Sequence, residues 1–137
     1  MLDYLPNFST PIDKNEARQI SPLVLAFIGD GVQTLFVRTG LVLNTTYSTN
    51  NLHKMTSNKV KAVSQAKQVD ILLDVFNEDE LAIYKRARNS SPNTLAKNAT
   101  VADYKKASGL EAVIGYLYLT GEHDRLNYLL EISNLED

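Results

Sequence analysis

The chain has 137 residues, of which 44% are hydrophobic and 22% charged, and its formal net charge is −2. This length fits a single domain with its own core, since domains typically run to roughly 100–150 residues. The chain contains no cysteine, which excludes disulfides, thiolate nucleophiles and cysteine-ligated metals and fits a reducing compartment.

Two further classes of protein are disfavoured by the composition. The two histidines are far apart in sequence, which argues against a histidine-based zinc site. No apolar run approaches the roughly 18 residues of a membrane span, and the N-terminus lacks a basic start followed by an apolar stretch. We therefore expect a cytoplasmic protein with no membrane partner.

Apolar residues recur at helical spacing along nearly the whole chain. A short helix is predicted at residues 15–20. Ser21 and Pro22 then form an N-cap and first-turn pair for a long apolar helix, which we expect to end near Arg38 with Gly40 as its stop.

The middle of the chain continues this pattern. Residues 52–55 indicate a short, turn-rich helical piece, and the apolar spacing over 60–76 predicts one amphipathic helix. Asn77, with Glu80 three residues later, forms a capping-box pattern for a helix that reaches about residue 88. A polar loop is expected at 89–99.

The last third of the chain carries two more helical patterns. Thr100 and Asp103 cap a helix that runs to about Leu119, with Gly121 beyond it, and a final amphipathic helix covers 126–132. Since no segment alternates as a strand does, the predicted fold class is all-α.

Basic residues are concentrated in two segments. Between Gly31 and Val69 there are five Lys or Arg residues and no acid, and between Lys85 and Lys106 there are six against one Asp. Such segregation is typical of binding to a phosphate backbone, although solvated helix faces remain the alternative. Because few aromatic residues are interleaved, we expect contact with a duplex backbone rather than with unstacked bases.

Asp30 and Glu111 are single acids near the middle of the two most apolar helices. Gly29 and Gly31 flank Asp30 and suggest close approach of a backbone or ligand, and Gly109 and Gly115 lie before and after Glu111. A lone buried carboxylate is costly, so each acid is expected to pair with a Lys or Arg, to hold a proton or to bind a cation. A carboxylate site without Cys or His suits Mg²⁺, and beside a phosphate-binding surface it indicates phosphodiester hydrolysis.

These two helices also carry a resemblance to a known family. LAFIGDGVQTLFVR resembles the signature helix of the ribonuclease III family, and SGLEAVIGYLYLTG resembles its second catalytic helix. The intervening KRARNSSPNTLAKNATVADYKKA is similar to the short branch, Mini-ribonuclease III, which lacks a double-stranded-RNA-binding domain. The resemblance covers about residues 21–130 and implies one catalytic domain over 1–137, with a ribonuclease III-like helical bundle at about 21–133.

The resemblance implies a homodimeric, Mg²⁺-dependent endoribonuclease that cuts duplex RNA, specifically the stem formed by the ends of precursor 23S ribosomal RNA. Asp30 and Glu111 take the positions of its catalytic metal ligands. Phe27 matches an aromatic residue that packs across the dimer interface. Ser108 stands where larger relatives carry a further acid, so it is a candidate to complete the surroundings of the metal. A ribosomal protein is a further candidate partner.

Six residues of the basic segments are candidates for RNA contact: Lys54, Lys59, Arg86, Arg88, Lys97 and Asn98. Solubility is the alternative for the first two, and a loop cap for Asn98. His53 and His123 are expected at or near the surface rather than in catalysis. Two other functions stay open, namely a non-catalytic double-stranded-RNA-binding dimer of the same fold and an oligomerisation module with no RNA role.

Overall fold

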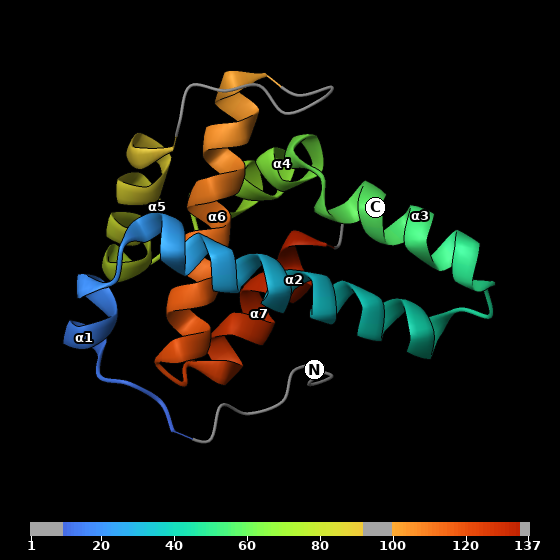
Figure 1. Ribbon diagram of the computed structural model, residues 1–137, viewed down its shortest axis with the longest axis horizontal. Helices are drawn as coiled ribbons and strands as arrows, with labels where there is room; N and C mark the ends of the chain where they lie inside the picture. Colours follow the sequence, from blue (N-terminus) through green and yellow to red (C-terminus); the bar gives the residue numbers. More distant parts are fainter. Residues whose placement is uncertain (1–9, 92–99, 135–137) are drawn as a thin grey trace.

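The computed structural model describes residues 10–91 and 100–134, and within these ranges the regular structure is entirely α-helical (Figure 1). The predicted all-α class is therefore confirmed. In chain order the helices are α1 (Lys14–Gln19), α2 (Pro22–Asn44), α3 (Thr49–Val60), α4 (Ala62–Leu72), α5 (Glu78–Ser90), α6 (Val101–Leu119) and α7 (His123–Ser133).

The two longest helices, α2 and α6, cross at the centre of the molecule (Figure 1). Between Ala107 and Leu117 every residue of α6 except Glu111 is buried, as expected for a helix that is apolar on nearly all sides. From α2, Leu25 and Phe36 are among the side chains that complete this core. The core is thus organised around α6.

Glycine allows α2 and α6 to touch backbone to backbone. A Cβ atom on Gly29 would lie 1.7 Å from the carbonyl oxygen of Glu111, and one on Gly115 would lie 2.0 Å from that of Leu25. Any larger residue would force the helices apart. The close approach predicted from the sequence is confirmed for Gly29, whereas Gly31 faces open space.

The other helices pack around this crossing. α4, α5 and α7 all contact α6, and α3 runs back along the distal half of α2 (Figure 1). Arg125 of α7 donates from Nε and Nη2 to the two carboxylate oxygens of Glu80 at the start of α5, each at 2.9 Å. Glu80 is 1% exposed, so this ion pair links two helix ends inside the fold.

Two predicted side-chain caps form as expected, whereas Ser21 occupies the N-cap position of α2 without a side-chain capping hydrogen bond. Asn77 and Glu80 make both hydrogen bonds of a capping box, and the Thr100 side chain accepts a hydrogen bond from the Asp103 amide. Gly121 has φ +74°, the left-handed conformation that commonly ends a helix. These local signals, each contained in a few residues, therefore located the helix boundaries correctly.

The predicted end of the long apolar helix was wrong. α2 continues through Gly40 to Asn44, and it ends where the Thr45 amide and hydroxyl both donate to the Leu41 carbonyl oxygen, at 3.0 and 2.7 Å. A glycine stops a helix when it takes the left-handed conformation, and among the described glycines only Gly121 does so.

The single helix predicted over 60–76 was also wrong. Lys61, with φ −69° and ψ 157°, separates α3 from α4, and the Ser64 hydroxyl donates to the Asn58 carbonyl oxygen across the break. The turn-rich piece expected at 52–55 belongs to the twelve-residue α3. The predicted helix is also too long at its end, because α4 stops at Leu72 and the amides of Val75 and Phe76 donate to the Leu72 carbonyl oxygen as the chain turns.

By length and composition alone, α2 is able to cross a membrane, which the sequence analysis did not anticipate. The core helix of a soluble protein meets the same criterion, and the inner face of α2 packs along α6. The helix therefore gives only weak support for a membrane span.

We predict that Gly115→Ala lowers the free energy of unfolding by about 1–3 kcal/mol, the usual cost of overpacking, because its Cβ meets backbone that cannot move aside. Urea unfolding followed by circular dichroism measures the loss. The matched control is Gly31→Ala, a helical position with open space, where alanine should stabilise by about 0.5–1 kcal/mol. Equal stability of the two variants would contradict the backbone contact.

Candidate metal and active site

The crossing of α2 and α6 brings Asp30 and Glu111 together. Asp30 directly follows Gly29, where an added Cβ atom would lie 1.7 Å from the Glu111 carbonyl oxygen. Asp30 acts on the Glu111 carboxyl through its charge and through a hydrogen bond. The structure therefore places the two acids predicted as metal ligands in one site.

The two acids differ in their access to solvent. Asp30 is exposed, whereas Glu111 is half-buried. Burial raises the pKa of Glu111 to about 8; a hydrogen bond from Gln65 acts to lower that pKa, and the neighbouring Asp30 raises it. Near neutral pH, and without a cation, the Glu111 carboxyl therefore retains a proton.

The ion-pair alternative does not apply to Glu111. The side chains that act on its carboxyl are Gln65 and Asp30, and no Lys or Arg of the described residues is among them. Two carboxyl groups held this close repel each other when both are ionised, and a cation relieves that repulsion.

The chemistry of this pair fits a hard divalent cation such as Mg²⁺, which prefers carboxylate oxygens and keeps several waters. The exposed face of Asp30 leaves room for those waters. In residues 10–91 and 100–134 there is no group of three or more His, Cys, Asp or Glu side chains that could hold a metal. Asp30 and Glu111 are thus the candidate ligands in this part of the chain.

The sequence analysis missed the neutral side chains behind Glu111. The Gln65 Nε2 atom lies 3.2 Å from Glu111 Oε2 and donates to it, and it also donates to Gln33 Oε1 at 2.7 Å. Gln65 and Gln33 are 3% and 0% exposed. Gln33 is a polar residue inside the apolar sequence of α2, three positions after Asp30, and this interruption could have identified it from the sequence.

Ser108 lies one turn before Glu111 on α6 and is buried. Its hydroxyl donates to the Tyr104 carbonyl oxygen at 3.2 Å and shares a hydrogen bond of 3.2 Å with the Ser91 hydroxyl. These contacts link the end of α5 to α6. A place beside the metal for Ser108 stays a prediction.

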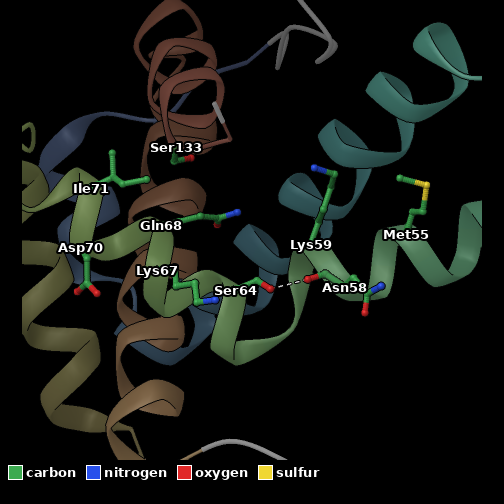
Figure 2. Close-up of a pocket in the computed structure, with 9 residues that line it drawn as sticks. All are labelled: Met55, Asn58, Lys59, Ser64, Lys67, Gln68, Asp70, Ile71 and Ser133. Carbon is green, nitrogen blue, oxygen red and sulfur yellow. Dashed lines mark hydrogen bonds between the residues drawn. The ribbon is translucent and has the colours of Figure 1, made fainter. Parts of the chain in front are cut away.

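The basic residues of α3 and α4 border an open hollow of about 560 Å³ (Figure 2). It is lined by Met55, Asn58, Lys59, Ser64, Lys67, Gln68, Asp70, Ile71 and Ser133. Burial lowers the pKa of Lys59. Lys54 is exposed on the same helix as Lys59, where it borders a second hollow with His53.

The α5 arginines are engaged within the fold. Arg86 Nη1 donates to the Arg18 carbonyl oxygen at 2.9 Å, and the Arg88 guanidinium lies 5.6 Å from the centre of the Tyr84 ring. Lys97 and Asn98 lie outside the described residues. His53 is exposed and His123 partly buried, which is the placement expected from the sequence.

Comparisons with known proteins agree with this geometry. Residues 23–122 match the Ribonuclease III domain family. The chain is 44% identical to the Mini-ribonuclease 3 of a Thermoanaerobacter species over 97% of this chain and 93% of the relative. It is 42% identical to the Mini-ribonuclease 3 of Staphylococcus aureus over 85% and 88% of the two chains. A crystal structure of a Fusobacterium nucleatum protein superposes with a TM-score of 0.79 at 33% identity, covering 85% of this chain and 95% of that one.

We predict that the acid pair makes the metal-free fold less stable as pH rises. The pKa of Glu111 is raised from 4.5 to about 8, so between these values the folded state binds more protons than the unfolded state, and stability falls across that window. Thermal unfolding from pH 5 to pH 9 in EDTA measures the slope. Glu111→Gln, which cannot titrate, should flatten it, and an identical slope in both proteins would contradict the assignment.

Proposed function

The chain belongs to the ribonuclease III family and is an endoribonuclease, and on that premise we propose that it cleaves double-stranded RNA with Mg²⁺ held by Asp30 and Glu111. The observation that carries the proposal is the meeting of these two acids at the α2–α6 crossing, one open to solvent and one half-buried. The eleven basic residues that the sequence concentrates in two segments also suit a polyanionic substrate.

Each side chain has a distinct part in the reaction. Asp30, which is exposed, would hold the cation on the solvent side. Glu111 would hold the same cation and would have to give up its proton to do so, since metal ligands must be deprotonated. When bound, Mg²⁺ supplies an activated water and stabilises charge on the phosphate. Gln65 keeps the Glu111 carboxylate in place through its hydrogen bond.

The duplex backbone is proposed to lie along α3 and α4. Lys59 and Lys67 border one hollow and Lys54 borders another beside it, which gives this side of the molecule a row of cations. Shape-dependent contact with phosphates and 2′-hydroxyls is the usual way in which proteins bind A-form RNA. Arg86 and Arg88 are weaker candidates, because their guanidinium groups already contact Arg18 and Tyr84.

The native substrate is proposed to be the stem formed by the ends of precursor 23S ribosomal RNA, in the cytoplasm, with a ribosomal protein as a candidate partner. The resemblance to the Mini-ribonuclease III branch supports this part of the proposal. Lys97 and Asn98 remain candidates for contact with that stem.

A homodimer is proposed to form through the outer face of α2. Phe27 is 81% exposed there. Other large apolar side chains exposed on the same helix are Leu23, Val24, Leu35, Val42 and Leu43. An apolar row of this length on one helix is typical of a protein interface. It adjoins Asp30, so a second copy would border the active site.

We predict that Asp30→Asn and Glu111→Gln keep the fold but lower Mg²⁺-dependent cleavage of duplex RNA by more than about 100-fold, beyond the usual effect of changing a residue behind a metal ligand. Gel analysis of a labelled duplex, with Mg²⁺ or EDTA, measures this. Asp74→Asn, at an exposed acid away from the pair, is the control.

Two outcomes of this assay would overturn the proposal. Wild-type cleavage by either acid variant would remove the metal site. Duplex binding by the wild-type protein in EDTA, with no cleavage after Mg²⁺ is added, would favour the non-catalytic RNA-binding alternative.

We also predict that wild-type protein has a mass in solution of twice 15.3 kDa and that Phe27→Asp has the monomer mass. A charge in the apolar face of α2 disfavours its burial against a second copy. Light scattering after size exclusion measures both masses. Tyr47→Asp changes another exposed aromatic residue and should stay dimeric. A dimeric Phe27→Asp protein would exclude this face as the interface.

A further inference from the structure

A row of four side-chain amides leads from the end of α7 to Glu111. Gln68 Nε2 donates to Asn134 Oδ1 at 3.2 Å, Gln33 Nε2 donates to Gln68 Oε1 at 2.8 Å, and Gln65 Nε2 donates to Gln33 Oε1 at 2.7 Å. The same Gln65 nitrogen donates to Glu111 Oε2 at 3.2 Å. We call these four residues, from α2, α4 and the end of α7, the amide row.

The hydrogen bonds of the amide row all run in the same direction from donor to acceptor. Asn134 Nδ2 donates to the Leu130 carbonyl oxygen of α7 at 2.6 Å, which leaves its Oδ1 atom to accept from Gln68. Gln68 and Gln33 then each accept on the oxygen from the next member and donate from the nitrogen to the previous one, and Gln65 donates to Gln33. If one of the central amides turned over, two oxygens or two nitrogens would face each other and both hydrogen bonds would be lost.

The direction of these hydrogen bonds determines which atom of the Gln65 amide faces Glu111. Because the Gln33 oxygen faces Gln65, the Gln65 amide must present its nitrogen, and that nitrogen has one hydrogen for Gln33 and one for Glu111. A donor on Oε2 restricts rotation of the carboxylate and favours its ionised form. The remaining interaction of the carboxyl is with Asp30, the other candidate ligand.

Packing alone does not account for the amide row. Gln33, Gln65 and Gln68 are 0%, 3% and 6% exposed, and apolar side chains of similar size would fill the same space without needing hydrogen-bond partners. Buried polar networks of this kind restrict side chains to a single arrangement when every member is satisfied. The free-energy cost of burying these amides is explained if their single arrangement serves the active site.

We propose that the amide row positions Glu111 for metal binding, with Gln65 as the positioning residue and Gln33, Gln68 and Asn134 acting through it. The proposal rests on the function proposed above, in which Glu111 is a metal ligand. It links the end of α7, which lies beside the α3–α4 hollow through Ser133, to the active site.

The test measures Mn²⁺ binding to the full chain by electron paramagnetic resonance, without RNA, in wild type, Gln65→Met and Gln33→Met. Methionine has nearly the shape of glutamine but no amide. We expect the dissociation constant to rise by about 10-fold or more in both variants, the range found for residues behind metal ligands. Asn134→Leu, at a half-buried position, removes the oxygen that accepts from Gln68 and should also weaken binding.

The control is Asn127→Leu, which removes a buried amide of α7 whose nitrogen donates within its own helix to the His123 carbonyl oxygen. It should lower stability but leave Mn²⁺ affinity within about twofold. In cleavage assays, excess Mg²⁺ should restore the turnover of the row variants. A variant that is merely unfolded would lose turnover at every Mg²⁺ concentration.

The two proposals can fail separately. If wild type binds Mn²⁺, Glu111→Gln does not, and the folded row variants bind as wild type does, the positioning role is wrong and the metal site stands. If Glu111→Gln binds Mn²⁺ as tightly as wild type, the metal site itself is wrong and the positioning role falls with it.

Discussion

The backbone contact between α2 and α6 is the constraint on which the rest of this structure depends. Packed helices usually keep their axes about 8–10 Å apart, which leaves room for side chains on both sides. At Gly29 and Gly115 those side chains are absent, so each helix lies against the carbonyl groups of the other. Asp30 follows one glycine and Glu111 precedes the other by one turn. The short side chain of an aspartate therefore reaches a glutamate on a different helix only because the helices touch here.

This contact also keeps in place an arrangement that the metal-free protein would otherwise avoid. Burial and a neighbouring acid both raise the pKa of Glu111, so the ionised pair is unfavourable until a cation arrives. The hydrophobic core around α6 provides the stability that maintains it. Active sites often contain such locally unfavourable groups because a ligand converts them into binding energy. Repulsion within the pair and the proposed affinity for a divalent ion thus have one origin.

The sequence predicted best the features that depend on a few neighbouring residues and those that interrupt a regular apolar pattern. The capping box at Asn77 involves residues three positions apart, and it formed as expected. Asp30 and Glu111 were recognised because charges interrupt apolar helices. The helix end predicted at Gly40 is absent, and the break at Lys61 was not predicted. Packing against other helices decides whether a glycine or one extended residue ends a helix. Gln65 and Gln68 were missed because neutral amides on an amphipathic helix are typical of its solvent face.

The choice of amides rather than charged groups behind Glu111 is itself informative. A lysine in place of Gln65 would stabilise the Glu111 carboxylate more strongly than an amide does, because charged donors make the stronger hydrogen bonds. It would also cancel the negative charge that attracts a cation and would compete with that cation for the same oxygens. An amide restricts the carboxylate without neutralising it. The basic residues accordingly lie at the surface of α3 and α4, where they can meet phosphates, while the inner side of the acid pair is neutral. Under the proposed function, this separation would let one small domain attract an anionic substrate and hold a cation at the same time.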